Sequence, residues 1–277
     1  MRDISRTINL YTGKLQETCQ FHEGERECSR EEGCVCRKLG EIKALTQELI
    51  EPIYRNSTFD SFTGKLPDGQ RAKPFRDDPN RINEVKKQLW KYLYGDTPMV
   101  PGGSREDYNR ISIIDKRHRE GASVVIHGKS GVYKKEQHGG YRYEHVPTGK
   151  TLLASIIMLD AINRNKHPSG KNWTYDKVSF LELRQALKSK DDSIYDMQDV
   201  DWLLIDDLVE IAEEGSSKKA SGWTKEVFDA FLIDRIQNHK PTILVCNFDI
   251  EDISVEERMG LAFQKILSSH TTHEIKV

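Results

Sequence analysis

The segment Val146-Pro147-Thr148-Gly149-Lys150-Thr151 is followed directly by an apolar run at residues 152–159. A Gly-Lys-Thr tripeptide that opens a helix brings backbone N–H groups, a lysine ammonium and a hydroxyl around one point. These are the groups that bind a triphosphate together with its Mg²⁺. We therefore interpret the segment as the core of a Walker A phosphate-binding loop, in which residues 147–151 surround the nucleotide.

The first glycine of the Walker A pattern is displaced in this chain. The full pattern, G-x-x-x-x-G-K-[ST], fails because Glu144 stands five positions before Gly149. Upstream, residues 121–128 have the apolar character of a buried strand and end in Gly128. Two short runs rich in tyrosine and basic residues then flank His138-Gly139-Gly140, a pattern typical of a β-hairpin. We predict that Gly128 is the first glycine of the loop and that a hairpin is inserted after it.

A second apolar run, Trp202-Leu203-Leu204-Ile205, ends in two carboxylates, Asp206 and Asp207. An apolar strand that ends in this way is typical of a Walker B motif. Its first carboxylate holds Mg²⁺ and its second residue polarises the attacking water. Because one predicted strand–helix unit lies between Lys150 and this run, we interpret the two motifs as parts of one ATP site.

A third strand candidate, Pro241-Thr242-Ile243-Leu244-Val245-Cys246, ends at Asn247. An asparagine at the end of a strand beside Walker B is the sensor 1 arrangement, in which the amide contacts the γ-phosphate or its water. Asn247 is therefore a candidate catalytic residue. Cys246 is interpreted as a small core residue.

The composition restricts the class of protein. The chain has 277 residues, 31% charged and 36% hydrophobic, which suits one nucleotide-binding domain with a smaller appendage. No apolar run reaches membrane-spanning length and residues 1–5 lack the apolar core of a signal peptide, so we expect a cytoplasmic protein with no membrane contact. The formal net charge of -2 predicts that any contact with nucleic acid is local.

Four of the five cysteines, Cys19, Cys28, Cys34 and Cys36, lie in one short polar segment with the spacing C-x8-C-x5-C-x-C. Such a segment cannot build its own apolar core, and four thiolates suit a tetrahedral structural Zn²⁺ whose binding energy folds it. His22 is an alternative ligand for one cysteine. Free surface thiols are the other interpretation.

The remaining pattern divides the chain into three parts. We predict an N-terminal arm, Cys-rich zinc module and helix at residues 1–54, with the helix over residues 37–54; a linker at residues 55–81; and an ATPase domain at residues 82–277. Within the linker, Phe59 and Phe62 are expected to pack on a neighbouring core. The fold class that follows is α/β, a three-layer α/β/α P-loop domain with a parallel sheet, preceded by a small zinc-binding domain.

Taken in order, these features resemble those of the bacterial and phage replicative helicase loaders of the DnaC/DnaI type, which are AAA+ ATPases akin to the IstB-type transposition helpers. The resemblance runs from about Cys19 to the end of the chain. It is carried by Cys34-Val35-Cys36, Thr58-Phe59-Asp60-Ser61-Phe62, Gly128, Gly149-Lys150-Thr151, Leu203-Leu204-Ile205-Asp206-Asp207-Leu208, Asp234-Arg235 and Pro241-Thr242-Ile243-Leu244-Val245-Cys246-Asn247.

The resemblance implies partners and residue roles. The N-terminal part would grip a hexameric DnaB-type replicative helicase, while the AAA+ part would bind ATP and single-stranded DNA and assemble with its neighbours. Lys150 would contact the β- and γ-phosphates. Thr151 and Asp206 would hold Mg²⁺. Asp207 would orient water and Asn247 would sense the γ-phosphate.

The chain departs from the family where an arginine finger is expected. Residues 260–267 correspond best to the arginine-bearing C-terminal helix of the family, but alanine and isoleucine stand where arginines belong. Arg235 and Arg258 are the remaining candidates, followed by Lys265. Because an arginine finger can contribute several orders of magnitude in rate, we expect weak intrinsic hydrolysis.

Two other functions fit parts of the sequence. An IstB-like ATPase that delivers target DNA to a transposase would bind duplex DNA stably, whereas a loader would prefer single strands. A non-hydrolysing, zinc-containing binding module would have a degenerate P-loop, and the retention of Thr151, Asp206 and Asn247 argues against it.

Overall fold

The computed structural model describes residues 35–60, 62–65, 69, 71–99, 102, 111–129, 131–135, 141–145, 148–164, 172–208, 220–252, 261–268 and 272–277. None of the helices in these ranges is long and apolar enough to cross a membrane.

A five-stranded, fully parallel sheet forms the centre of the molecule. In spatial order its strands are β4 (Tyr175–Ser179), β5 (Trp202–Leu208), β6 (Thr242–Cys246), β1 (Val124–His127) and β7 (His273–Lys276). Parallel strands need crossover connections, and buried parallel strands are apolar on both faces. The predicted α/β class with a parallel sheet is confirmed.

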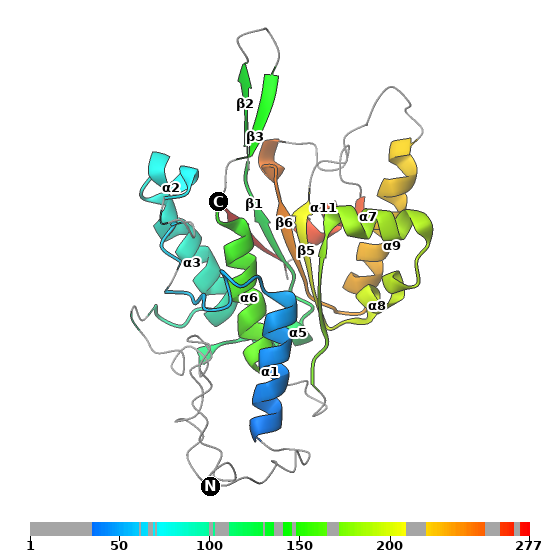
Figure 1. The fold of residues 1–277 in the computed structure, drawn as a ribbon, viewed down its shortest axis with the longest axis horizontal. Helices are drawn as coiled ribbons and strands as arrows, with labels where there is room; N and C mark the ends of the chain where they lie inside the picture. Colours follow the sequence, from blue (N-terminus) through cyan, green and yellow to red (C-terminus); the bar gives the residue numbers. More distant parts are fainter. Residues whose placement is uncertain are drawn as a thin grey trace.

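Helices cover both faces of this sheet (Figure 1). One layer contains α1 (Val35–Leu49), α3 (Arg81–Tyr94), α5 (Ile114–Arg119) and α6 (Lys150–Arg164), and the other contains α7 (Phe180–Ser189), α8 (Ser193–Asp199), α9 (Ala220–Gln237) and α11 (Leu261–Ser268). Successive strand residues face opposite layers. In β1, accordingly, Val124 and Ile126 belong to the core on the α6 face, and Val125 belongs to the core on the α9 face.

The strand order places a topological switch point at β1. The chain leaves β1 through α6 for the far strand β4, returns to β6 beside β1, and then crosses to β7 on the other side of β1. In open parallel sheets, ligands bind outside the carboxyl ends of the strands at such a point. The topology therefore directs attention to the carboxyl ends of β1, β5 and β6.

The predicted hairpin is present. Strands β2 (Gly131–Lys135) and β3 (Tyr141–His145) pair antiparallel in a sheet of their own, with Tyr133 opposite Tyr143. The hairpin stands out from the body between β1 and α6, beyond the carboxyl end of β1 (Figure 1).

The linker aromatics pack as predicted. Phe59 is 3% exposed and meets the Trp90 ring edge-on with 5.0 Å between centroids, and Phe62 is fully buried. The short helix α2 (Lys73–Asp77) supplies Phe75, whose ring meets that of Phe62 edge-on with 5.5 Å between centroids. Edge-to-face pairs of this kind fix the path of a segment that has little regular structure.

The N-terminal helix differs from the predicted range of residues 37–54, because α1 spans Val35–Leu49 and turns occupy residues 52–56. Its buried Ile42 and Leu49, together with Ile50, join the same core cluster as the apolar residues of α6. Cys19, His22, Cys28 and Cys34 lie outside the described residues, and Cys36 lies in α1. Within the described ranges, no three His, Cys, Asp or Glu side chains are grouped as a metal site would require. The zinc module stays a prediction.

Candidate nucleotide-binding site

Gly128 follows β1 and has a backbone conformation that a side chain would disturb. Its φ is +143°, and a Cβ atom there would lie 2.4 Å from the carbonyl oxygen of Val277. Its N–H donates a hydrogen bond of 3.0 Å to the carbonyl of Phe248. Only glycine fits between these two backbone segments.

The Gly-Lys-Thr tripeptide begins α6, and Lys150 connects it to Gly128. The Lys150 Nζ donates to the carbonyl oxygen of Gly128 at 2.5 Å, although the hairpin separates the two residues in sequence. Lys150 is 3% exposed, and burial lowers the pKa of its ammonium to about 8. Gly149 has a φ of +87°, and a Cβ atom there would touch the Phe62 and Phe75 rings. The contact of Lys150 thus brings the two glycines close together, and the linker aromatics pack beside Gly149.

Thr151 faces the first carboxylate of β5. Its Oγ1 lies 3.5 Å from Oδ1 of Asp206, at the outer limit of a hydrogen bond. Burial raises the pKa of the Asp206 carboxyl, and the nearby Lys177 ammonium opposes this shift. A hydroxyl and a carboxylate beside the predicted phosphate-binding turn are oxygen ligands of the kind that Mg²⁺ prefers, so the donor set fits this ion.

A β-bulge at the end of β5 directs Asp207 differently from Asp206. The pairing with β6 shifts register between Ile205 and Leu208, and Asp207 has a φ of +60°. The Asp207 N–H donates to Oδ1 of Asp206 at 2.9 Å. Asn247, at the end of β6, donates from Nδ2 to Oδ1 of Asp207 at 2.6 Å. Bulges often re-aim side chains at functional sites, and this one places Asp207 beside the predicted sensor residue.

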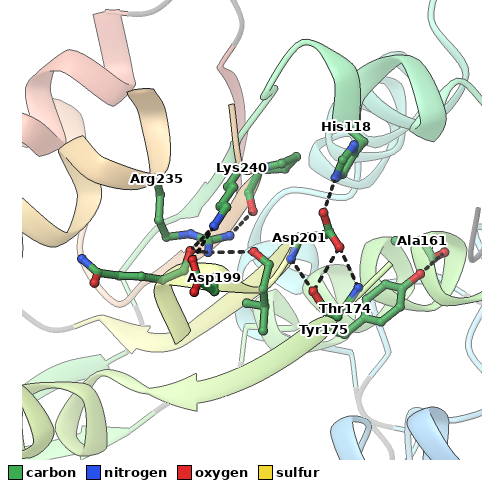
Figure 2. A network of polar contacts seen from close by, with 11 residues as sticks. His118, Ala161, Thr174, Tyr175, Asp199, Asp201, Arg235 and Lys240 are labelled. Atoms are coloured by element: carbon green, nitrogen blue, oxygen red, sulfur yellow. Dashed lines mark hydrogen bonds and ion pairs between the residues drawn. The ribbon is translucent and has the colours of Figure 1, made fainter. Parts of the chain in front are cut away.

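Arg235 is far from this arrangement, which corrects its assignment as a catalytic arginine. The side chain is 1% exposed. Its guanidinium donates to Thr242 Oγ1 and to four carbonyls, those of Met197, Gln198, Val200 and Pro241, at 2.9–3.1 Å. These acceptors precede or begin β5 and β6, so Arg235 lies at the amino ends of the strands (Figure 2). A buried guanidinium with this many partners cannot reach a neighbouring subunit.

Two further candidates, Pro147 and Arg258, lie outside the described residues, and Lys265 is exposed on α11. The predicted residues that come together at the carboxyl edge of the sheet are Gly128, Thr148, Gly149, Lys150, Thr151, Asp206, Asp207 and Asn247.

Sequence reasoning missed Lys177 in β4. Its Nζ lies 3.9 Å from Oδ2 of Asp206 and 3.0 Å from Oε1 of Glu51. The signal that could have revealed it is a lysine inside a strand, Tyr175–Ser179, that pairs with the strand bearing the two aspartates. Although β4 is the edge strand, the Lys177 side chain is only 19% exposed, and a charged group buried to this degree needs a partner of opposite charge.

Comparison with known proteins gives structural matches alone. No family model and no curated protein matches the chain. The chain is similar to a protein assigned as a primosome component from Streptococcus pyogenes serotype M3, with 12% identity over 84% of this chain and 94% of that chain and a TM-score of 0.46. It is similar to DnaI, with 20% identity over 69% and 93% and a TM-score of 0.38. It is also similar to the DnaC helicase loader, with 18% identity over 69% and 99% and a TM-score of 0.39. Solved structures of the DnaC and DnaI type, which the motifs resemble, are thus among those to which this chain is similar.

Proposed function

We propose that this chain is an AAA+ ATPase that binds ATP with Mg²⁺ and loads a hexameric replicative helicase onto single-stranded DNA. The observation that carries the ATP site is the contact between the Lys150 ammonium and the Gly128 carbonyl. It closes one phosphate-binding turn from two glycines that the hairpin separates. Asp206, Asp207 and Asn247 gather at the same edge of the sheet.

The residues at the carboxyl ends of the strands have separate roles in phosphate binding and hydrolysis. When nucleotide enters, the Lys150 ammonium exchanges the Gly128 carbonyl for the β- and γ-phosphates, and the N–H groups of the turn and of the first turn of α6 donate to phosphate oxygens. Thr151 and Asp206 would hold Mg²⁺, which when bound neutralises charge on the phosphates. Asp207 orients the attacking water, and Asn247 fixes Asp207 while contacting the γ-phosphate.

Hydrolysis by the isolated chain should be weak. The five hydrogen bonds of Arg235 hold it at the opposite edge of the sheet, so it cannot stabilise charge on the γ-phosphate. Arg258 is the remaining candidate for an arginine finger. Self-assembly through the AAA+ domains, or a partner, would be needed to complete the site.

The assignment of a helicase and of DNA as partners depends on the order of the sequence motifs. We assign the grip on a DnaB-type helicase to residues 1–54, with Zn²⁺ held by Cys19, Cys28, Cys34 and Cys36, and the ATPase to residues 82–277 beyond the linker at 55–81. The net charge of -2 favours local contact with single strands over the broad basic surface that stable binding of duplex DNA needs.

The experiment is to mix the purified chain with the replicative helicase of its own host, with and without ATP and Mg²⁺, and to measure the mass of the complexes by light scattering. A discrete complex is expected, and serine substitutions of the four cysteines should abolish it. In parallel, a fluorescent ATP analogue should bind the wild type roughly a hundredfold more tightly than Lys150→Met. Absence of a helicase complex, with ATP-dependent assembly on duplex DNA, would overturn the loader assignment in favour of a transposition helper.

A further inference from the structure

Lys177 lies between the predicted Mg²⁺ ligand and the segment that follows α1. Its ammonium is 3.0 Å from Oε1 of Glu51 and 3.9 Å from Oδ2 of Asp206. The side chains of Lys177, Asp206 and Glu51 are 19%, 13% and 48% exposed, respectively. The cation thus lies between two anions, of which one belongs to the proposed metal site and the other to the N-terminal segment.

Glu51 is held in place by the end of α1. Arg55 donates from Nε to the Ile50 carbonyl at 2.8 Å and from Nη2 to the Gln47 carbonyl at 2.7 Å, which fixes the turn that contains Glu51. Nearer the start of α1, Glu41 accepts a hydrogen bond of 3.0 Å from Asn172, which lies shortly before β4. The position of Glu51 relative to β4 is therefore defined by the helix.

Tyr54 gives separate support for the proximity of this segment to the site. Its pKa is raised by burial and also by the negative charges of Glu51 and Asp206. The segment that follows α1 thus shares the electrostatic field of the proposed metal ligand.

A divalent cation at Asp206 and the ammonium of Lys177 cannot both occupy the same carboxylate without repulsion. Like charges within a few ångströms of one another in a partly buried site repel, and the repulsion is little reduced by solvent. When Mg²⁺ binds Asp206, Lys177 must withdraw. Glu51, already the nearer of its two partners, is the anion that receives it.

We propose that Lys177 is a positioning residue that neutralises Asp206 in the absence of Mg²⁺ and pairs fully with Glu51 when Mg²⁺ is bound. The segment after α1 thereby sets the Mg²⁺ concentration at which the site takes up nucleotide. This inference rests on the proposed ATP site and adds to it a physical connection to the N-terminal part, which we assign to partner binding. A partner that displaces Glu51 would raise the Mg²⁺ requirement.

The test measures binding of a fluorescent ATP analogue to the full chain while Mg²⁺ is varied. Lys177→Met removes the competing cation and should lower the half-saturating Mg²⁺ concentration by roughly threefold to tenfold. Glu51→Gln removes the receiving anion and should raise that concentration by roughly the same factor. The double variant should behave like Lys177→Met, because Glu51 acts through the lysine.

Lys240→Met is the matched control. Lys240 has a similar exposure of 20% and a similar ion pair of 3.0 Å with Asp199, but it lies at the amino ends of the strands (Figure 2). It should leave the Mg²⁺ requirement unchanged. Shifts of Lys177→Met and Glu51→Gln in the same direction, or no shift in either, would overturn this inference alone. Failure of the wild type to bind the analogue at any Mg²⁺ concentration would overturn the proposed function as well.

Discussion

The amino ends of the strands form one edge of the central sheet and their carboxyl ends form the opposite edge. Both edges hold buried charged groups, but the chain supplies partners for these groups differently at each. At the amino ends of the strands, Arg235 makes five hydrogen bonds within the chain. There too Asp201 accepts hydrogen bonds from the Thr174 N–H and hydroxyl at 2.8 and 3.0 Å and lies 3.2 Å from His118 (Figure 2). At the carboxyl ends, Asp206 accepts one hydrogen bond of 2.9 Å from the Asp207 N–H, while its side-chain partners, a hydroxyl at 3.5 Å and an ammonium at 3.9 Å, are both at the limit of contact.

This difference distinguishes the structural network at the amino ends from the binding site that we propose at the carboxyl ends. Where the chain supplies every partner at short distance, the charges hold secondary structure together and leave nothing for a ligand. Where the hydroxyl and the ammonium nearest to Asp206 are both at the limit of contact, a ligand can supply stronger interactions than the chain does. Substitutions at the two edges should therefore have opposite effects on stability and binding.

The largest effect is expected for Arg235→Met. The substitution removes one donor from four carbonyls and a threonine hydroxyl in a buried region, and among the described residues only the Gln198 and Pro241 carbonyls keep another donor, from Lys240 and the Leu203 N–H. It should therefore lower the free energy of unfolding by about 3–5 kcal/mol. Urea denaturation measures this loss. Nucleotide affinity of the protein that remains folded should not change. A loss of less than about 1 kcal/mol would remove the contrast between the two edges.

Lys150→Met should have the reverse profile. Removing the ammonium should weaken nucleotide binding by about 3 kcal/mol, roughly a hundredfold in Kd. Burial lowers the pKa of Lys150 to about 8, so the charged form is disfavoured in the folded protein and its removal should leave the free energy of unfolding equal or higher. Calorimetric titration and urea denaturation of the same samples provide both values. Unfolding of the variant at lower urea would show that Lys150 is needed for the fold itself.

Asp201→Asn tests, through the pH dependence of the free energy of unfolding, whether the ionised carboxylate at the amino ends of the strands stabilises the fold. Burial alone would raise the pKa of Asp201, but hydrogen bonds from His118 and Thr174 outweigh it and lower the pKa to about 2. Because this is below the value of about 3.9 in the unfolded chain, the carboxylate stabilises the fold above about pH 4, and this contribution is lost as the pH falls towards 2. The variant should be about 2 kcal/mol less stable at pH 7, and the gap should narrow below pH 4. If the difference in free energy of unfolding between the wild type and the variant does not change with pH, ionisation of Asp201 contributes nothing to the stability of the fold.

The sequence predicted the carboxyl edge better than the amino edge, for a physical reason. The residues that we propose to bind phosphate and Mg²⁺ lie at or directly after the ends of apolar runs, so Gly128, Asp206 and Asn247 are marked by their position in the pattern. Arg235 has no such mark, because its partners are main-chain carbonyls that any sequence supplies. Lys177 and Glu51 are distant in sequence, and their contact depends on how α1 packs on the sheet.

The smallest effect concerns the backbone of Asp207 and separates strain from side-chain chemistry. Asp207→Gly and Asp207→Ala both remove the hydrogen bond from Asn247, but only glycine adopts a φ of +60° without steric cost. The glycine variant should therefore be more stable than the alanine variant by about 1 kcal/mol. Lys190, which has a φ of +56° at the end of α7, is the control for the same backbone conformation away from the site, and its glycine and alanine variants should differ in stability by a similar amount.

The activity of the two Asp207 variants separates the role of the carboxylate from that of the bulge. If both variants still bind nucleotide while their hydrolysis rates fall equally, the carboxylate acts on water and the bulge serves to position it. Equal stability of the two variants would instead mean that the bulge relaxes to ordinary strand geometry once the carboxylate is removed.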